Sequence, residues 1–363
     1  MFDWLIVGAG FAGSVLAERI ASQRQETVLL IDKRDHIGGS AYDYIDKQGI
    51  LVHRYGPHIF HTNSKSVFNY LSQFTEWRPY EHRVAASVGG RLFPIPINRE
   101  TLNQLYDLTL TTDPEVEAFL ATKAQHIRHP MNAEDIILRQ VGRELFEIFF
   151  KNYTFKQWGI EAAALHPSVT SRIPVRTNAD DRYFTDTYQF MPKDGYSSLF
   201  TKILDQPNIT LALGESYASV RDHFHFGRTI FTGPIDEFFE FRLGRLPYRA
   251  IQFEHRQVDQ QWHQPVAVIN YPGYEKYTRI AEYKHITGQF NPKTSISYEY
   301  PGDVGEPSYP IPSTANFEKY TSYRKLAIDT PNVLFAGRLA TYRYYNMDQV
   351  IAQSLSVFSR IDK

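Results

Sequence analysis

The stretch FDWLIVGAGFAGSV, residues 2–15, opens with an apolar run of strand length, continues through three glycines and passes into a helical pattern. A second apolar run, residues 27–31, ends at Asp32. Continuous apolar runs of this length are typical of strands that are buried on both faces. The segment therefore predicts a strand–helix–strand unit at the start of an α/β fold.

The three glycines indicate a dinucleotide site, because each meets a different physical need. Gly8 permits a tight turn, Gly10 lets the backbone approach a pyrophosphate, and Gly13 lets the helix pack closely against the strand. The N-terminus of the helix supplies free N–H groups to phosphates. Asp32, at the tip of the second strand, is placed to accept hydrogen bonds from ribose hydroxyls.

A second diglycine and a second strand–glycine element favour FAD over NAD. Gly38 and Gly39 follow Asp32 closely, as is typical of flavoproteins, and residues 333–338 form another apolar strand that ends in Gly337-Arg338. A helix that begins near Met347 would aim its positive end at the flavin ring and stabilise negative charge there. We expect the cofactor to contact the following residues: Gly8, Gly10, Phe11, Gly13, Ser14, Asp32, Lys33, Arg34, Gly38, Gly39, Ser40, His58, Ile59, Gly337, Arg338, Met347, Asp348, Gln349 and Val350.

The composition excludes several other functions. The net charge of −1 provides no basic field for nucleic acid. The absence of cysteine excludes disulfides, thiolate catalysis and cysteine-ligated metal, and it fits a cytoplasmic protein. No apolar run reaches the ~18 residues of a membrane span. Because the first strand begins at Phe2, we expect no signal peptide. We expect no metal.

The periodicity of apolar residues changes along the chain and predicts three domains. Helical spacing dominates residues 99–155, whereas residues 84–97 and 248–300 alternate like antiparallel strands. The predicted fold is α/β: a Rossmann-like FAD-binding domain with an inserted helical domain and an antiparallel β-sheet domain. The FAD-binding domain is predicted to comprise residues 1–80, 193–245 and 316–363. The helical domain is predicted to comprise residues 99–167. The antiparallel β-sheet domain is predicted to comprise residues 81–98, 168–192 and 246–315.

Nine motifs, spread in order along the chain, carry a more specific signal. They are IDKRDHIGGSAY (31–42), YGPHIFHTN (55–63), NYTFKQWG (152–159), SRIPVR (171–176), DRYFTDTYQFMPKDGY (181–196), TGPID (232–236), AVINY (267–271), YTRIAEYKH (277–285) and LFAGRLATYRYYNMDQV (334–350). In these motifs the chain resembles the bacterial UDP-galactopyranose mutases over nearly its whole length.

The resemblance implies an isomerase that interconverts UDP-galactopyranose and UDP-galactofuranose, for cell wall polysaccharides. It implies FAD in the reduced form, FADH⁻, whose N5 is the covalent nucleophile at the anomeric carbon. It further implies a homodimer or higher homo-oligomer, with the helical domain serving both uridine binding and dimerisation.

The resemblance also assigns roles to individual residues. Arg172 and Arg279 match the two arginines that grip the diphosphate, a role that suits the forked guanidinium group. His58 matches a residue that shapes the flavin edge and the sugar pocket. These three are the expected catalytic residues. The remaining expected substrate contacts are His82, Phe150, Tyr153, Gln157, Trp158, Tyr183, Phe184, Asn270, Tyr309, Tyr344 and Asn346.

The stretch 169–181 is expected to be a mobile lid that carries Arg172, with Tyr183 and Phe184 closing over the nucleotide. Aromatic residues at helical spacing are also common in cores, which is the simpler interpretation of Phe150.

Three alternatives remain open at this point. The first is a flavin oxidoreductase of the amine-oxidase type, since the nucleotide-binding fold alone serves many reactions. The second is a mutase for UDP-N-acetylgalactopyranose, and the third is a nucleotide-sugar binding protein without turnover.

Overall fold

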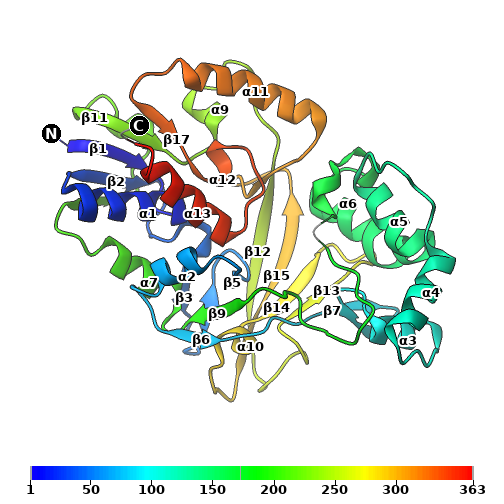
Figure 1. Ribbon diagram of the computed structural model, residues 1–363. Helices are drawn as coiled ribbons and strands as arrows, with labels where there is room; N and C mark the ends of the chain where they lie inside the picture. Colours follow the sequence, from blue (N-terminus) through cyan, green and yellow to red (C-terminus); the bar gives the residue numbers. More distant parts are fainter. Residues whose placement is uncertain (1, 172, 362–363) are drawn as a thin grey trace.

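The computed structural model describes residues 2–171 and 173–361. It consists of a parallel sheet with helices on both faces, a central mixed sheet and a lobe of helices (Figure 1). In the described part of the chain, no helix is long and apolar enough to cross a membrane.

The five-stranded sheet is parallel throughout and has the strand order β10-β2-β1-β11-β17. Helices α1 and α13 pack against each other on one face, and α11 lies on the other (Figure 1). The first and last parts of the chain thus complete one layer, which confirms the predicted Rossmann-like fold. The bounds are β1 (Phe2–Val7), β2 (Val28–Asp32), β10 (Ile209–Leu213), β11 (Phe226–Phe231), β17 (Val333–Phe335), α1 (Phe11–Arg19), α11 (Thr314–Ile328) and α13 (Met347–Phe358).

The turn between β1 and α1 depends on its glycines. Gly8 has φ +104°, a conformation that residues with a side chain rarely adopt. A Cβ at Gly13 would lie 1.9 Å from the carbonyl oxygen of Gly8, so α1 can approach β1 this closely only with glycine there. Beyond the turn, Val15 and Leu16 are fully buried, and α1 contacts α13 and α7 (Gly195–Leu204).

The second sheet has seven strands in the order β16-β12-β15-β14-β13-β7-β8. All its pairs are antiparallel, as expected for this domain, except β13 with β7, which run parallel and make the sheet mixed. The cause is long-range, because the β7–β8 hairpin comes from early in the chain and joins the open edge of β13. The bounds are β7 (Val84–Val88), β8 (Arg91–Ile95), β12 (Tyr248–Val258), β13 (Val268–Asn270), β14 (Arg279–Glu282), β15 (Thr294–Gly302) and β16 (Tyr309–Pro310).

Two smaller sheets join the large ones. One is the hairpin of β3 (Asp43–Ile45) and β4 (Leu51–His53), and the other has the order β5-β9-β6. Strand β9 (Tyr188–Pro192) lies in the range assigned to the antiparallel domain, yet it pairs with β5 (Phe60–Thr62) and β6 (Trp77–Pro79) from the N-terminal range.

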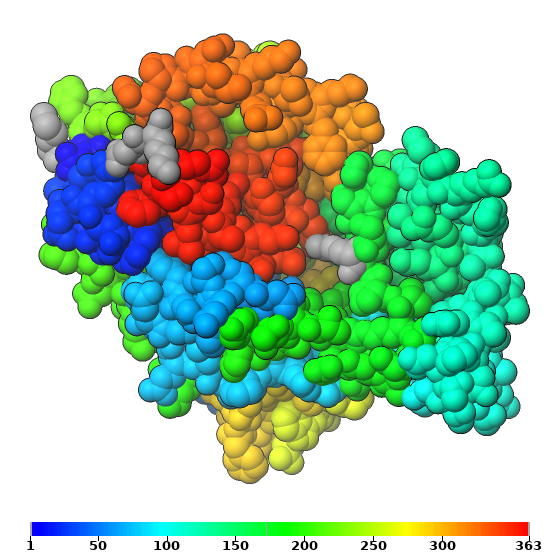
Figure 2. Space-filling model, viewed as in Figure 1, coloured from blue at the N-terminus to red at the C-terminus, as the bar shows by residue number. Residues whose placement is uncertain are grey.

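The helical lobe projects from one side of the large sheet and is coloured cyan to green in Figures 1 and 2. Its helices begin at polar caps: the side chains of Asn98 and Asn132 each accept a hydrogen bond from a first-turn N–H. The last helix ends at Gly159, which has φ +73°. The bounds are α3 (Arg99–Tyr106), α4 (Asp113–Lys123), α5 (Ala133–Leu145), the π-helical η3 (Phe146–Lys151) and α6 (Asn152–Trp158).

Candidate cofactor and substrate site

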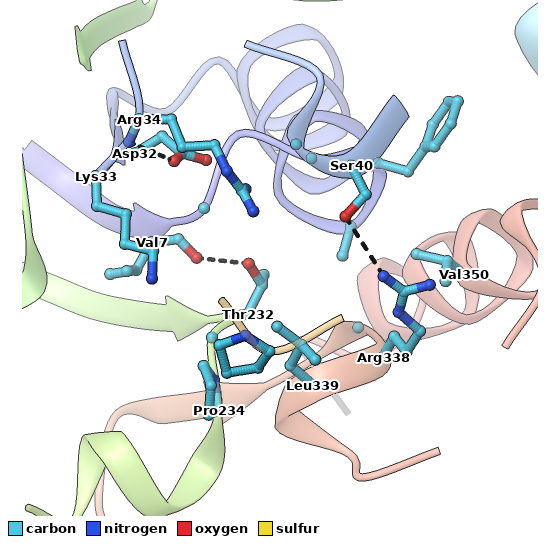
Figure 3. Close-up of a pocket in the computed structure, with 18 of the residues that line it drawn as sticks. Val7, Asp32, Lys33, Arg34, Ser40, Thr232, Pro234, Arg338, Leu339 and Val350 are labelled. Carbon is cyan, nitrogen blue, oxygen red and sulfur yellow. Dashed lines mark hydrogen bonds between the residues drawn. The ribbon is translucent and has the colours of Figure 1, made fainter. Parts of the chain in front are cut away.

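A cavity of about 220 Å³ lies over the carboxyl ends of β1, β2 and β11, where a doubly wound sheet binds its ligand. Most of the residues expected at the cofactor line it: Gly8, Gly10, Phe11, Asp32, Lys33, Arg34, Gly38, Gly39, Ser40, His58, Gly337, Arg338, Met347 and Val350. Figure 3 shows labelled members of this set converging from the end of β2 and the residues after it, from Ser40 beside the second pair of glycines, and from the C-terminal elements.

Asp32 is buried and holds the glycine turn in place. One carboxylate oxygen accepts the N–H of Ala9 at 2.8 Å, and the other accepts the N–H of Arg34 at 2.9 Å. Each carboxylate oxygen has further lone pairs, which a ribose hydroxyl could use. The same residue can therefore fix the turn and bind a sugar.

Close backbone approach shapes the middle of the cavity. Gly39 has φ +55°, and a Cβ on it would lie 2.9 Å from the Cα of Gly10. Across the cavity, a guanidinium nitrogen of Arg338 lies 3.4 Å from the hydroxyl of Ser40 (Figure 3). Two glycine-rich segments and the second strand–glycine element therefore meet at one cavity, as a long dinucleotide requires.

Some cavity residues were not among the expected contacts. They are Val7, Ala12, Ala41, Glu215, Ser216, Tyr217, Phe231, Thr232, Gly233, Pro234, Glu237, Glu306, Pro307, Leu339 and Tyr345. The motif TGPID (232–236) was an available signal for part of this set. Glu215 to Tyr217 carried no recognisable signal, because their place depends on the pairing of β10 with β2.

Five expected cofactor residues lie outside the walls of this cavity. Gly13 and Ser14 pack inside α1, with the Ser14 hydroxyl donating to the carbonyl of Ala9. Asp348 accepts a hydrogen bond from Thr62, and Gln349 accepts one from the N–H of Asn346 at the start of α13. The fifth is Ile59, which packs against the main hydrophobic core.

A second cavity, of about 770 Å³, adjoins the first, and both walls include Ser40, His58 and Arg338. Of the expected substrate residues, Gln157, Arg279, Tyr309 and Tyr344 line it. Tyrosines and acids that the sequence did not single out also belong to its wall, among them Tyr42, Tyr55 and Glu299.

Arg279 is held by two neighbours at this second cavity. Its guanidinium donates to the hydroxyl of Tyr153 at 2.7 Å, and its Nε lies 3.3 Å from a carboxylate oxygen of Glu299. Burial alone would lower the pKa of Arg279, but the Glu299 carboxylate and the nearby phenols raise it on balance. The arginine therefore presents a fixed positive charge to the cavity.

Glu299 is one of the residues at this site that sequence reasoning missed. It is buried and pairs with Arg279 across β14 and β15. Burial raises the pKa of its carboxyl, and the charge of Arg279 opposes the rise. An acid among the aromatic residues of ISYEYP was a possible signal, but its partner could not be known without the strand register.

Helix α6 brings Gln157 into the wall of the same cavity, whereas Tyr153 and Trp158 lie outside that wall. The Gln157 side chain donates to the hydroxyl of Tyr309, and its Oε1 has no hydrogen-bond partner among the described residues. The Trp158 ring packs edge-on against Tyr309 and Tyr344, with ring centroids 5.0 and 5.6 Å away. Burial raises the pKa of Tyr309, so its hydroxyl keeps its proton and can donate.

A second group of expected residues lies around Tyr183 and Phe184, which follow the stretch 169–181 that was expected to be a lid. The ring of Phe184 stacks on that of His61, with the ring centroids 3.6 Å apart. The backbone N–H of Tyr183 donates to the carbonyl of His82, and the His82 ring lies beside the rings of Tyr183 and Phe184. Burial lowers the pKa of His82 to about 3, so its ring is neutral. These residues form one cluster, which lies outside the walls of the two cavities.

His58 occupies the junction of the two cavities. Its backbone N–H donates to Nδ1 of His53, and its own Nδ1 lies 2.8 Å from the carbonyl of Gly56. Burial lowers the pKa of His58 to about 4. Nδ1 then carries the proton and Nε2 is an acceptor, so the neutral ring is oriented by the backbone.

The other expected residues are placed as follows. Phe150 is buried in the main core, and Asn270 lies opposite Arg279 in the β13–β14 pair with an Oδ1 that lacks a partner among the described residues. Asn346 caps α13. Arg172 lies outside the described residues. Arg176, four residues after Arg172 in the SRIPVR motif, donates to the backbone carbonyls of Asp180 and Arg182, so its guanidinium is bound within its own segment.

Comparison with known proteins agrees with this geometry. The family model described as UDP-galactopyranose mutase matches residues 148–344, and the one described as NAD(P)-binding Rossmann-like domain matches residues 6–74. A "Probable UDP-galactopyranose mutase" of Klebsiella pneumoniae is 42% identical, covering 97% of this chain and 92% of that one. The dTDP-fucopyranose mutase of Escherichia coli is 37% identical, with 97% and 96% covered, and the UDP-galactopyranose mutase of Mycoplasma genitalium is 35% identical, with 98% and 93% covered.

Solved structures share the fold at low sequence identity. A reduced UDP-galactopyranose mutase superposes with a TM-score of 0.80 at 16% identity, covering 99% of this chain and 95% of that one. Putrescine oxidase bound to putrescine superposes with a TM-score of 0.59 at 11% identity, covering 99% and 98%. At such identities the likeness concerns the fold alone.

Proposed function

The chain belongs to the UDP-galactopyranose mutase family, and we propose that it is an isomerase that interconverts UDP-galactopyranose and UDP-galactofuranose with FAD in its reduced form. The observation that carries this proposal is the junction of the two cavities. His58 and Arg338 belong to both walls, so a ligand on the dinucleotide turn and one beside Arg279 would meet there.

The residues of the first cavity fit FAD. Asp32, the carboxylate proposed to bind the ribose, and His58, at the junction of the cavities, belong to the same wall. Between them, Gly10 and Gly39 leave a path for the cofactor that no side chain blocks. Met347, at the N-terminus of α13, lies in the same wall, where the helix dipole favours negative charge. When bound and reduced, the flavin would supply a nucleophilic nitrogen, N5, to the anomeric carbon of the sugar.

The side chains of the protein are proposed to bind and orient the nucleotide sugar and to stabilise the negative charge of its diphosphate. Arg279, fixed by Glu299 and Tyr153, would bind the diphosphate and stabilise the charge that develops on a departing UDP. Arg172 is proposed as the second arginine on the strength of the SRIPVR motif. The neutral His58 would shape the sugar pocket and accept a hydrogen bond without moving a proton.

The uridine is proposed to bind beside α6, with the substrate contacts at Gln157, Trp158, Tyr309 and Tyr344. Gln157 Oε1 supports this, because a buried amide oxygen without a partner among the described residues is an acceptor available to a nucleotide. We further propose that the enzyme is cytoplasmic and forms a homodimer through the helical lobe.

The decisive experiment is an anaerobic assay of the purified protein with UDP-galactofuranose, followed by chromatography of UDP-galactopyranose. We expect turnover after dithionite reduction and none with oxidised flavin. dTDP-fucofuranose and UDP-N-acetylgalactofuranose are tested in parallel, because a relative named dTDP-fucopyranose mutase is 37% identical. Faster turnover of either would reassign the substrate, and equal rates with oxidised flavin would contradict the proposed role of the reduced cofactor.

A further inference from the structure

Arg249 is a buried cation outside the walls of both cavities. It lies on β12, its side chain is 4% exposed, and the expected site residues did not include it. A buried guanidinium is costly to desolvate, so each of its donors should have a partner. Those partners indicate what Arg249 does.

The guanidinium binds the C-terminal end of α6. Its Nε donates to the carbonyl of Gln157 at 3.1 Å, and one Nη donates to the carbonyl of Lys156 at 3.2 Å. The last carbonyls of a helix have no partner within the helix and carry partial negative charge. Arg249 therefore fixes the end of the helix that carries Gln157 and Trp158.

Asp303 and Tyr309 complete the arrangement from the other side. Asp303, just after β15, forms an ion pair with the second Nη of Arg249. Tyr309 lies opposite Arg249 in the β12–β16 pair and also donates to the carbonyl of Gln157, at 3.2 Å. The large sheet thus holds the end of α6 through two side chains on neighbouring strands.

Gly159 shows how closely the guanidinium approaches the helix. A Cβ on Gly159 would lie 2.6 Å from an Nη of Arg249, and the residue has φ +73°. The glycine of the KQWG sequence thus ends the helix and leaves room for the arginine. Lys156 also attaches helix α6 to the segment that connects β13 and β14. Its ammonium group donates to the backbone carbonyls of Tyr271, Glu275 and Tyr277.

We propose that Arg249, paired with Asp303, is a positioning residue for nucleotide binding. It sets the distance between α6, with Gln157 and Trp158, and the sheet that carries Arg279, Tyr309 and the second cavity. The inference rests on the proposed function, since it assumes that a nucleotide diphosphate binds between these elements. Arg249 itself does not touch the substrate.

The test compares Arg249→Met, Arg249→Lys and Asp303→Asn in the FAD-loaded enzyme. A positioning role acts on the ground state and the transition state alike, so KM should rise while kcat changes little. We expect Arg249→Met to raise KM and the calorimetric Kd for UDP about tenfold or more, as loss of charged hydrogen bonds predicts, with kcat within about threefold. Arg249→Lys should raise KM and the Kd for UDP less than Arg249→Met does. For Asp303→Asn both constants should lie between those of the unchanged protein and those of Arg249→Met.

The matched control is Arg256→Met on the same strand, because Arg256 is half-exposed and its guanidinium contacts Glu254 and the ring of Tyr298 rather than α6. Its KM and UDP affinity should equal those of the unchanged protein. The visible flavin spectrum of every variant should be unaltered.

The inference is overturned if Arg249→Met leaves both KM and Kd within about twofold, or if kcat alone falls. Should Arg249→Met fail to fold, Arg249→Lys and Asp303→Asn are judged by the same measure. An unchanged protein that binds UDP without turnover would overturn the proposed function alone, whereas one that binds no UDP would overturn both.

Discussion

Arg279 shows how one residue can be prepared for an anionic ligand before the ligand arrives. The buried Glu299 carboxylate keeps the guanidinium charged and limits its rotation, and Tyr153 fixes the other end of the fork. Preorganised charge needs no rearrangement when negative charge develops on a diphosphate. The side chain is still 30% exposed towards the cavity, so it remains accessible to a ligand.

Arg279→Ala should lower kcat/KM by roughly 100-fold or more, because it removes charge-assisted hydrogen bonds and leaves Glu299 buried without its partner. Arg279→Lys should lose less, since it keeps the charge without the fork. The measurement is the anaerobic rate with UDP-galactofuranose, alongside the visible flavin spectrum, which should not change. An undiminished rate for the alanine variant would remove Arg279 from the site.

Among single residues, the motifs predicted some of those that line the cavities, and residues whose partners depend on strand register were missed. Arg279 was expected from YTRIAEYKH, and it lies at the second cavity. Glu299 and Arg249 were not expected, because their partners lie across strand pairs or on a distant helix. Local patterns carry no information on which strands become neighbours.

At the scale of elements, the glycine turn separates what the fold needs from what the cofactor needs. A Cβ at Gly13 would clash with the protein itself, at the Gly8 carbonyl. A Cβ at Gly10 would meet only the Cα of Gly39, at an ordinary 3.6 Å, and Gly10 lies in the cavity wall. Packing therefore requires glycine at Gly13, whereas packing alone would admit a methyl group at Gly10, where we propose that the cofactor requires glycine.

Gly10→Ala should fold normally yet lose FAD affinity by about tenfold or more, because its methyl group would occupy the path of the pyrophosphate. The Tm of the FAD-free variant should stay close to that of the FAD-free unchanged protein. Flavin binding is followed by quenching of its fluorescence on titration. Gly13→Ala is the contrasting variant and should lower the Tm itself. Equal FAD affinity in Gly10→Ala would contradict the assigned role.

For some helices and strands, the periodicity of apolar residues was sufficient to predict the element. The strands at both ends of the chain and the helices between residues 99 and 158 follow their apolar patterns. The parallel β13–β7 pair and the pairing of β9 with β5 and β6 do not follow from any local pattern. Each joins segments that are far apart in sequence, so it is decided by how the domains pack.

Across the whole molecule, buried histidines make the fold sensitive to acid. Burial lowers the pKa of His53 and of His82 to about 3 and that of His58 to about 4, from an ordinary 6.5. Between pH 6.5 and these values the unfolded chain binds protons that the folded protein does not. Stability must therefore fall as the pH falls through this window.

The free energy of unfolding should decrease by about 1.5 kcal/mol for each of the buried residues His53 and His82 between pH 6.5 and 5. Buried carboxyls with raised pKa values, such as Glu299 and Asp43, act in the opposite direction, so the histidine part is isolated by comparing variants. Urea unfolding of His82→Gln should depend less steeply on pH over this window than that of the unchanged protein, whatever its absolute stability. His129→Gln, at an exposed position, should leave the slope as it is. Identical slopes for His82→Gln and the unchanged protein would contradict the prediction. They would show that the imidazole of His82 is protonated in the folded state as readily as in water. The prediction rests on the burial of His82 among Tyr80, Tyr183 and Phe184.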